Sequence, residues 1–238
     1  MAEATGITIM ATAAVKEAFR ELVPLFETSK HCSVTPLWMP TVDMLRRLEG
    51  GEVVDVILLT GETIDELTAK GIVARGSRAD IMKSSVGMAV RAGAPKPDIR
   101  SAEAFKQSML AARSIAYSFG PSGVYIAELF QRLGIAGQLG ARAKQVKGVP
   151  IGELVAKGEA EIAFQQVSEL LPVPGIDLLG ALPPGIEKIT VFSTGLHRAA
   201  PRADIARDFV RYLVSAEAAP VMRRTGLEPL TEPHHPAR

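Results

Sequence analysis

Residues 53–59 read VVDVILL, and this stretch decides the fold class. Six of its seven residues are apolar, which is typical of a strand that is covered by helices on both faces. Further strands are expected at 7–10, 33–38, 83–91, 114–117, 161–164 and 188–196. Segments with helical spacing separate most of these runs. The alternation predicts an α/β protein with an open, largely parallel sheet.

The helices are expected from the spacing of apolar residues. Val15, Phe19, Leu22 and Phe26 recur at intervals of four, three and four residues, as on the buried face of a helix. Other helices are expected at 101–112, 123–133, 149–157, 202–214 and 217–225. The tail TEPHHPAR at 231–238, which carries His234 and His235, is expected to be disordered.

Length and charge limit the class of protein. With 238 residues, the chain is long enough for one large domain or for two lobes of roughly 100 residues each. Its 27 Lys and Arg nearly balance its 26 Asp and Glu, so no nucleic-acid-binding surface is expected. No apolar run reaches the roughly 18 residues of a membrane helix, so direct membrane insertion is not expected either.

Cysteine and histidine usage bears on cofactors. Cys32 is the only cysteine, so an intrachain disulfide and a multi-cysteine metal site are excluded. There is no His-Glu-x-x-His motif and no cluster of closely spaced carboxylates, so neither a metal nor another cofactor is expected. The first residues, MAEATGITIM, lack the pattern of a secretory leader. The expected compartment is therefore the cytoplasm, or the periplasm if Met1 replaced a leader.

Three junctions between a strand and a helix are candidates for a ligand site. They read ATAA at 11–14, MPTV at 39–42 and FGPSGVY at 119–125. In open α/β sheets, ligands bind at the carboxyl ends of strands, where helix N-termini offer N–H groups to anions. Thr41 and Ser122 add hydroxyls at two of these junctions, although each can equally be a simple helix cap. Their recurrence on separate units favours a shared anion site.

Five stretches, in this order, resemble the molybdate-binding family of type II periplasmic solute-binding proteins. They are ITIMATAAVKEAF at 7–19, TVDMLRRLEGGEVVDVILL at 41–59, GPSGVYIAELFQRLGI at 120–135, GVPIGELVAKGEAEIAF at 148–164 and ARDFVRYLVSAEAAPVMRRTGLEP at 206–229. Each motif is weak alone, but their common order and spacing make the match more specific. The resemblance covers nearly the whole chain.

The resemblance implies a two-lobed fold of the type II periplasmic binding proteins, in which each lobe is a mixed sheet with helices on both faces. Lobe I would comprise residues 1–82 and 195–238, and lobe II would comprise residues 83–194. Two crossing segments would join the lobes, and a small anion would lie in the cleft between them. Because the family also carries an acid at the position of Asp55, we expect this residue to anchor the backbone at its strand end.

The resemblance also implies where the ligand is held. The family's contact positions, and the residues beside them that offer polar groups, are Thr12, Ala14, Thr41, Ser122, Gly123, Val124, Val149, Phe164, Gln165 and Gln166. Ala14 and Phe164 stand where the family has a serine and a tyrosine, so two hydroxyl donors are lost, each worth about 1–3 kcal/mol. The amides of Gln165 and Gln166 both donate and accept, which suits an organic carboxylate better than molybdate.

Two functions are consistent with these residues. The leading interpretation is a substrate-binding protein that delivers a small organic anion to the membrane component of an ABC transporter. The alternative is a cofactor-independent enzyme, because aconitate isomerase is similar to the same family and would move a proton along an allylic tricarboxylate. An enzyme needs a general base near the ligand, and His197 and Glu169 are the candidates. Either residue can instead be a packing residue or the start of a helix.

Overall fold

The computed structural model describes residues 6–230, and the chain divides into two compact units. Unit 2 comprises Ser84–Thr190, and unit 1 comprises the chain before and after it. Unit 1 resumes at Val191, and the lobe boundaries implied by the resemblance, at 82/83 and 194/195, stay a prediction.

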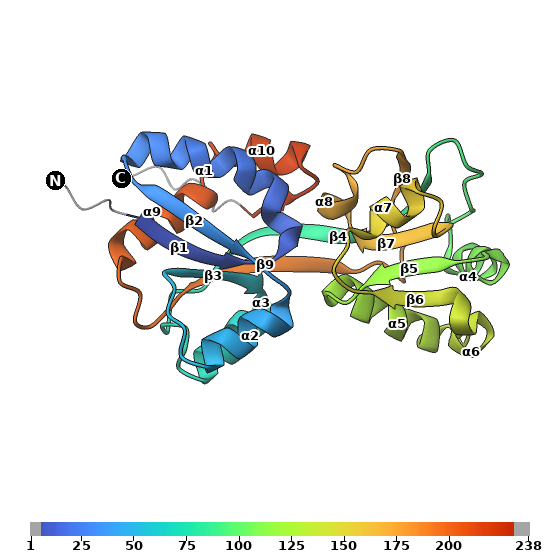
Figure 1. The fold of residues 1–238 in the computed structure, drawn as a ribbon, viewed down its shortest axis with the longest axis horizontal. Helices are drawn as coiled ribbons and strands as arrows, with labels where there is room; N and C mark the ends of the chain where they lie inside the picture. The colour runs from blue at the N-terminus through green and yellow to red at the C-terminus, as the bar shows by residue number, and fades with distance from the viewer. Residues whose placement is uncertain (1–5, 231–238) are drawn as a thin grey trace. The chain divides into compact units, whose positions relative to one another are not determined.

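Two long strands carry the chain between the units (Figure 1). β4 (Ala79–Arg91) begins in unit 1 and ends in unit 2, and β9 (Ile189–Leu196) returns. None of the described helices is long and apolar enough to cross a bilayer. The tail at 231–238, with His234 and His235, lies outside the described residues.

Unit 1 is built on a mixed sheet with the strand order β2-β1-β3-β9. β1 (Gly6–Ala11) is parallel to both β2 (Ser33–Trp38) and β3 (Val56–Thr60), and β9 runs antiparallel to β3. The remaining elements of unit 1 are η1 (Ala13–Val15), α1 (Lys16–Lys30), α2 (Thr41–Glu49), α3 (Gly61–Ala69), α9 (Ala203–Leu213), α10 (Ala219–Arg224) and β10 (Glu228–Pro229).

The apolar run that contains β3 is covered on both faces. Val56 and Leu58 pack into one core cluster together with α1 and α9. Ile57 and Leu59 belong to a second cluster, which α2 and α3 complete. Successive strand residues point to opposite faces, so a strand buried on both sides has to be apolar throughout.

Unit 2 contains a second mixed sheet, in which β4, β7, β5 and β6 are neighbours in that order and β8 also pairs with β4. β5 (Ile115–Ser118) is parallel to β6 (Ala143–Val146) and to β7 (Ile162–Gln166), and β4 is antiparallel to β7. The other elements are α4 (Ala102–Ala111), α5 (Pro121–Arg132), α6 (Ala136–Leu139), η2 (Gly140–Arg142), α7 (Ile151–Ala156), α8 (Val167–Leu170) and β8 (Ile176–Ala181).

The two faces of the unit 2 sheet have different covers. Ile162 and Phe164 of β7 pack with α4 and α5 in one cluster. Ala163 packs with α7 and α8 in the other. Ala163 therefore faces α7 and α8, whereas Ile162 and Phe164 face α4 and α5. By the same alternation, Gln165 lies on the face of Ala163.

Some elements were not predicted from the sequence. β6 reads AKQV and has half-buried or exposed residues, and β8 lies in a segment rich in proline and glycine. Both therefore lack the apolar run that marked the other strands. The expectation that Thr41 caps its helix is wrong, because Pro40 is the N-cap of α2 and Thr41 is its first residue.

Asp55 is a buried anchor at the start of β3, as expected. One carboxylate oxygen accepts the backbone N–H of Thr8 on β1 at 2.8 Å, and the other accepts the N–H of Arg202 before α9, also at 2.8 Å. The residue is 4% exposed. Hydrogen bonds to a charged acceptor contribute about 1.5–3 kcal/mol each, so Asp55 ties β1 and α9 to β3.

Replacing Asp55 with alanine should lower the free energy of unfolding of unit 1 by about 2–4 kcal/mol, since the backbone N–H groups of Thr8 and Arg202 lose their acceptor. Denaturant unfolding followed by circular dichroism measures this change. The control is Asp204→Ala, which removes an exposed carboxylate paired with Arg207 and should cost less than about 1 kcal/mol. Equal costs for the two variants would contradict the anchoring role.

Candidate functional site

The carboxyl ends of the parallel strands in unit 2 gather the starts of three helices. Tyr117 on β5 pairs with Phe164 on β7, so Ser118, the last residue of β5, lies beside Gln165, the last but one of β7. α5 begins after β5, α7 begins after β6, and α8 begins directly after β7. We take this edge, which joins strand ends to helix N-termini, as the candidate functional site of unit 2.

A pair of serines lies where β5 meets α5. The Ser118 and Ser122 hydroxyls are 3.1 Å apart, and Ser118 Oγ also accepts the N–H of Gly120 at 3.3 Å. Gln145 Nε2 donates to the Ser118 carbonyl at 3.1 Å. Ser122 was predicted as a site residue, whereas Ser118 was missed. Its signal was a hydroxyl at the end of a strand, just before the FGPSG loop.

Gly123 has a structural role that the sequence did not predict. A Cβ at this position would lie 1.6 Å from the Ser118 carbonyl oxygen, so only glycine lets α5 approach β5 this closely. The N–H groups of Gly123 and Val124 both donate to the Gly120 carbonyl, at 2.9 and 3.1 Å. Both amides, which were predicted as ligand donors, donate inside the helix, and their role in ligand binding stays a prediction.

A buried glutamine connects two helices at the end of β7. Gln165 Oε1 accepts the backbone N–H of Ile151 in α7 at 3.0 Å, and Gln165 Nε2 donates to Glu169 Oε1 at 2.7 Å. Gln165 is 6% exposed. Its amide therefore has a fixed partner on each side.

Glu169 is the titratable group at this edge. The residue keeps partial exposure, but burial of its carboxyl raises the pKa to about 7 from its usual value of 4.5. Hydrogen bonds from Gln165 and from the Gln166 backbone act against this rise. The preceding hydroxyl, Ser168 Oγ, is buried and has no hydrogen-bond partner among the described residues. Carboxyls with strongly shifted pKa values are enriched at functional sites.

Gln166 is used elsewhere in unit 2. In the amide orientation that satisfies every partner, its oxygen accepts from Thr190 Oγ1 at 2.8 Å, and its nitrogen donates to the carbonyls of Ser84 and Ser85 at 3.2 and 3.1 Å. The side-chain amide of Gln166 thus has partners within the protein, and its role in ligand binding stays a prediction. Adjacent strand residues point to opposite faces, so Gln165 and Gln166 cannot share one environment.

Two other residues predicted for unit 2 lie in contrasting places. Phe164 is fully buried, and its ring packs edge-on or tilted against Phe105 and Phe130, so its side chain belongs to the core and not to a ligand site. Val149 is exposed in the loop before α7. Only Val149 is available to a ligand through its side chain.

Unit 1 offers an edge of the same kind. Thr12 follows β1, and Thr41 opens α2 shortly after β2. Ala11 pairs with Trp38 at the ends of these adjacent parallel strands, so both threonines lie at the carboxyl edge of the sheet. Ala14 is buried in the core beside η1. The expectation that Thr41 and Ser122 contact the same ligand stays a prediction.

His197 lies at the opposite edge of the unit 1 sheet. It follows Leu196, which pairs with Val56 at the start of β3, and its N–H donates to the Asp55 carbonyl at 3.2 Å. Its ring Nδ1 accepts the N–H of Ala199 at 3.1 Å, and burial lowers its pKa. The structure does not bring His197 together with the threonines at the carboxyl edge.

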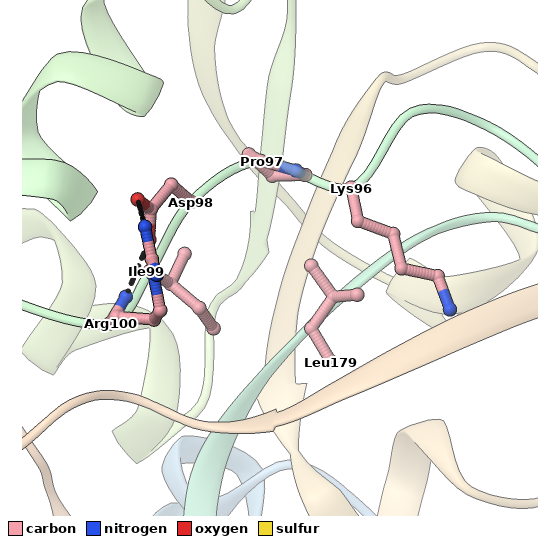
Figure 2. Close-up of a pocket in the computed structure, with 6 residues that line it drawn as sticks. All are labelled: Lys96, Pro97, Asp98, Ile99, Arg100 and Leu179. Carbon is pink, nitrogen blue, oxygen red and sulfur yellow. Dashed lines mark hydrogen bonds and ion pairs between the residues drawn. The ribbon is translucent and has the colours of Figure 1, made fainter.

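A hollow elsewhere in unit 2 is no better candidate. Figure 2 shows its lining residues Lys96, Pro97, Asp98, Ile99, Arg100 and Leu179. The segment follows β4, whose Val90 pairs with Ile162 at the start of β7, so it lies away from Gln165 and Glu169. Its charges are matched by neighbours, Arg100 by Asp98 and Lys96 by Asp177. Within residues 6–230, no group of three or more His, Cys, Asp or Glu side chains is placed to hold a metal ion.

Known proteins are similar to this chain along nearly its whole length. Residues 7–228 match the family model described as bacterial extracellular solute-binding protein. A relative named aconitate isomerase, from a Pseudomonas species, is 37% identical over 232 residues, covering 95% of this chain and 88% of that protein.

Solved structures show the same fold at low identity. The periplasmic molybdate-binding protein of Azotobacter vinelandii has a TM-score of 0.75 at 16% identity, covering 93% of this chain and 98% of that one. The binding protein AgtB from A. tumefaciens R10, solved with agropinic acid, has a TM-score of 0.72 at 14% identity, covering 95% and 83%. The fold is therefore that of the type II periplasmic binding proteins, as the motifs implied.

The raised pKa of Glu169 makes stability depend on pH. Between about pH 4.5 and pH 7 the folded protein holds a proton that the unfolded chain has released, so stability falls as pH rises through this window. Across this pH window, the free energy of unfolding of the wild type should fall by about 1–3 kcal/mol relative to that of Glu169→Gln. Thermal unfolding at several pH values measures the difference.

The control for this prediction is Glu103→Gln, which changes an exposed glutamate on α4 that accepts from Gln107. That variant should keep the pH dependence of the wild type. Parallel stability curves for wild type and Glu169→Gln would show that the Glu169 carboxyl titrates alike in the folded and unfolded chain, contrary to the account.

Proposed function

Because the chain belongs to the bacterial extracellular solute-binding proteins, we propose that it binds a small organic acid and isomerises it, as a cofactor-independent isomerase of aconitate type. The sequence alone favoured a receptor. Two findings favour the enzyme instead: the 37% identity to an aconitate isomerase along 95% of the chain, and the carboxyl of Glu169 at the edge where helices α5, α7 and α8 begin.

Glu169 carries the proposal. A general base works best when its pKa lies near the operating pH, because both protonation states are then populated. Burial raises the pKa of Glu169 to about 7, which meets this requirement. A receptor needs hydrogen-bond donors for an anion but has no use for a half-protonated carboxyl beside them.

The proposed reaction is a proton shift along an allylic system. Aconitate is a propene skeleton that carries one carboxylate on each carbon. Ionised Glu169 takes a proton from the methylene carbon, and the electron pair of that C–H bond spreads over the skeleton and its carboxylates. Return of the proton to the other terminal carbon forms the new C–H bond and moves the double bond. Atoms and electrons balance without an oxidant, a reductant or a cofactor.

Hydrogen-bond donors would stabilise the charge that develops in this step. The N-terminus of the twelve-residue helix α5 attracts negative charge, and the Ser118 and Ser122 hydroxyls lie at its start. Thr12 and Thr41 follow two parallel strands of unit 1 and offer hydroxyls at the carboxyl edge of that sheet.

The substrate class follows from the missing hydroxyls. Ala14 and Phe164 are buried and have no side-chain donor, which weakens the case for a tetrahedral oxyanion such as molybdate. A carboxylate ligand is in keeping with the agropinic acid held by a protein of the same fold. We therefore propose a di- or tricarboxylate as the substrate.

The variant Glu169→Gln should lower the interconversion of cis- and trans-aconitate at least about 100-fold, since the amide cannot accept the carbon-bound proton. Chromatography of the two acids measures turnover. Binding should persist, and isothermal titration calorimetry with aconitate measures it. The control His197→Ala should retain turnover, because His197 lies at the far edge of that sheet.

Two results would overturn the proposal. Full turnover by Glu169→Gln would remove Glu169 as the base. Saturable binding of aconitate by the wild type without any interconversion would leave the receptor interpretation, and the membrane component of an ABC transporter would then be the partner to seek.

A further inference from the structure

We propose that Gln165 is a positioning residue that holds Oε1 of Glu169 as a permanent hydrogen-bond acceptor, so that proton transfer to and from the substrate passes through Oε2. The inference rests on the proposed function for its chemical consequence. Its structural basis is the chain of hydrogen bonds from Ile151 through Gln165 to Glu169.

The backbone fixes which way the Gln165 amide points. The N–H of Ile151 faces Oε1 at 3.0 Å, and an N–H group cannot face the amide nitrogen without placing two donors together. Nε2 must therefore face Glu169, whose Oε1 lies 2.7 Å away. Because this neighbour only donates, Oε1 of Glu169 accepts. The Gln166 backbone N–H is a second donor to the same carboxyl. We assign the proton of the neutral carboxyl to Oε2.

The surrounding packing keeps this arrangement in place. Every residue of β7 is buried, and Gln165 pairs with Gly87 on the neighbouring strand β4. A Cβ on Gly87 would come within 2.8 Å of the Val167 side chain, so the glycine makes room for the start of α8. Glu169 follows two residues later in α8. A fixed strand and a fixed first turn thus set the spacing between the amide and the carboxyl.

Neighbouring charged residues do not account for the raised pKa of the Glu169 carboxyl. α8 packs against β7, α7 and β8. The charged groups on these elements are Glu153 on α7, which pairs with Lys157 at 3.0 Å, and Asp177 on β8, which pairs with Lys96 at 3.3 Å. The influences on the pKa of Glu169 are burial, which raises it, and the N–H donors of Gln165 and Gln166, which lower it. Removing the Gln165 donor should therefore raise this pKa further.

The test variant is Gln165→Glu, which keeps the size of the side chain and the acceptor for Ile151 but turns an oxygen toward Glu169. Two adjacent carboxyls cannot both ionise easily, so they titrate as a coupled pair with one strongly raised apparent pKa. In the plot of kcat against pH, the acidic limb should move to higher pH by at least about one unit, while KM should change much less. A purely structural role for Gln165 would lower activity at every pH without moving the limb.

A matched pair elsewhere in unit 2 supplies the control. Gln107 Nε2 donates to Glu103 Oε1 at 2.8 Å, so the same residue types meet at the same spacing of four residues, but on the exposed face of α4. The variant Gln107→Glu should leave the pH profile unmoved. A second test variant, Gln165→Met, removes the donor with little change in volume and should also move the acidic limb upward.

A direct titration separates this inference from the proposed function. Carboxyl ¹³C NMR of Glu169 should give a higher midpoint in Gln165→Met than in the wild type, whether or not the protein turns over aconitate. In the wild type, the side-chain amide resonance of Gln165 should titrate with the same midpoint as the Glu169 carboxyl. A shifted midpoint of the Glu169 titration without turnover of aconitate would contradict only the isomerase proposal. A Gln165 amide that does not follow the Glu169 titration would overturn the positioning role, with or without catalysis.

Discussion

The parallel pairing of β5 with β7 is the constraint on which the candidate site depends. It brings Ser118 and Gln165 to the same edge of the sheet, and the chain leaves each strand directly into a helix. Gly123 then lets α5 approach the end of β5, while Gly87 lets α8 turn sharply after β7. These two close approaches help to position the polar groups at this edge.

The fold class could be predicted because burial on both faces leaves a strong mark in a sequence. The stretch VVDVILL and its counterparts gave most strands, and the five ordered motifs gave the family. β6 and β8 escaped prediction because they are only partly buried, so polar residues are tolerated in them. Asp55 could be assigned as an anchor, since a carboxylate inside an apolar strand needs backbone donors.

The candidate site was harder to predict from the sequence. Gln165 and Gln166 look equivalent in one dimension, yet the alternation of strand side chains sends one to α7 and α8 and the other to Ser84, Ser85 and Thr190. The amides of Gly123 and Val124 looked available, but they close the first turn of α5. Glu169 could be named from the sequence as a candidate base, whereas its raised pKa depends on burial that only packing in three dimensions creates.

Within one fold, an isomerase needs a titratable group beside the ligand that a receptor does not need. Anion binding uses helix N-termini and hydroxyls, which this chain has in both units. Proton transfer adds one group that exchanges a proton near neutral pH, and Glu169 meets that condition. The most direct measurement is proton NMR of aconitate incubated with the protein in D₂O. The account predicts that solvent deuterium enters the terminal carbons as the cis and trans acids interconvert. Aconitate that binds saturably by calorimetry yet gains no deuterium and does not interconvert would contradict it.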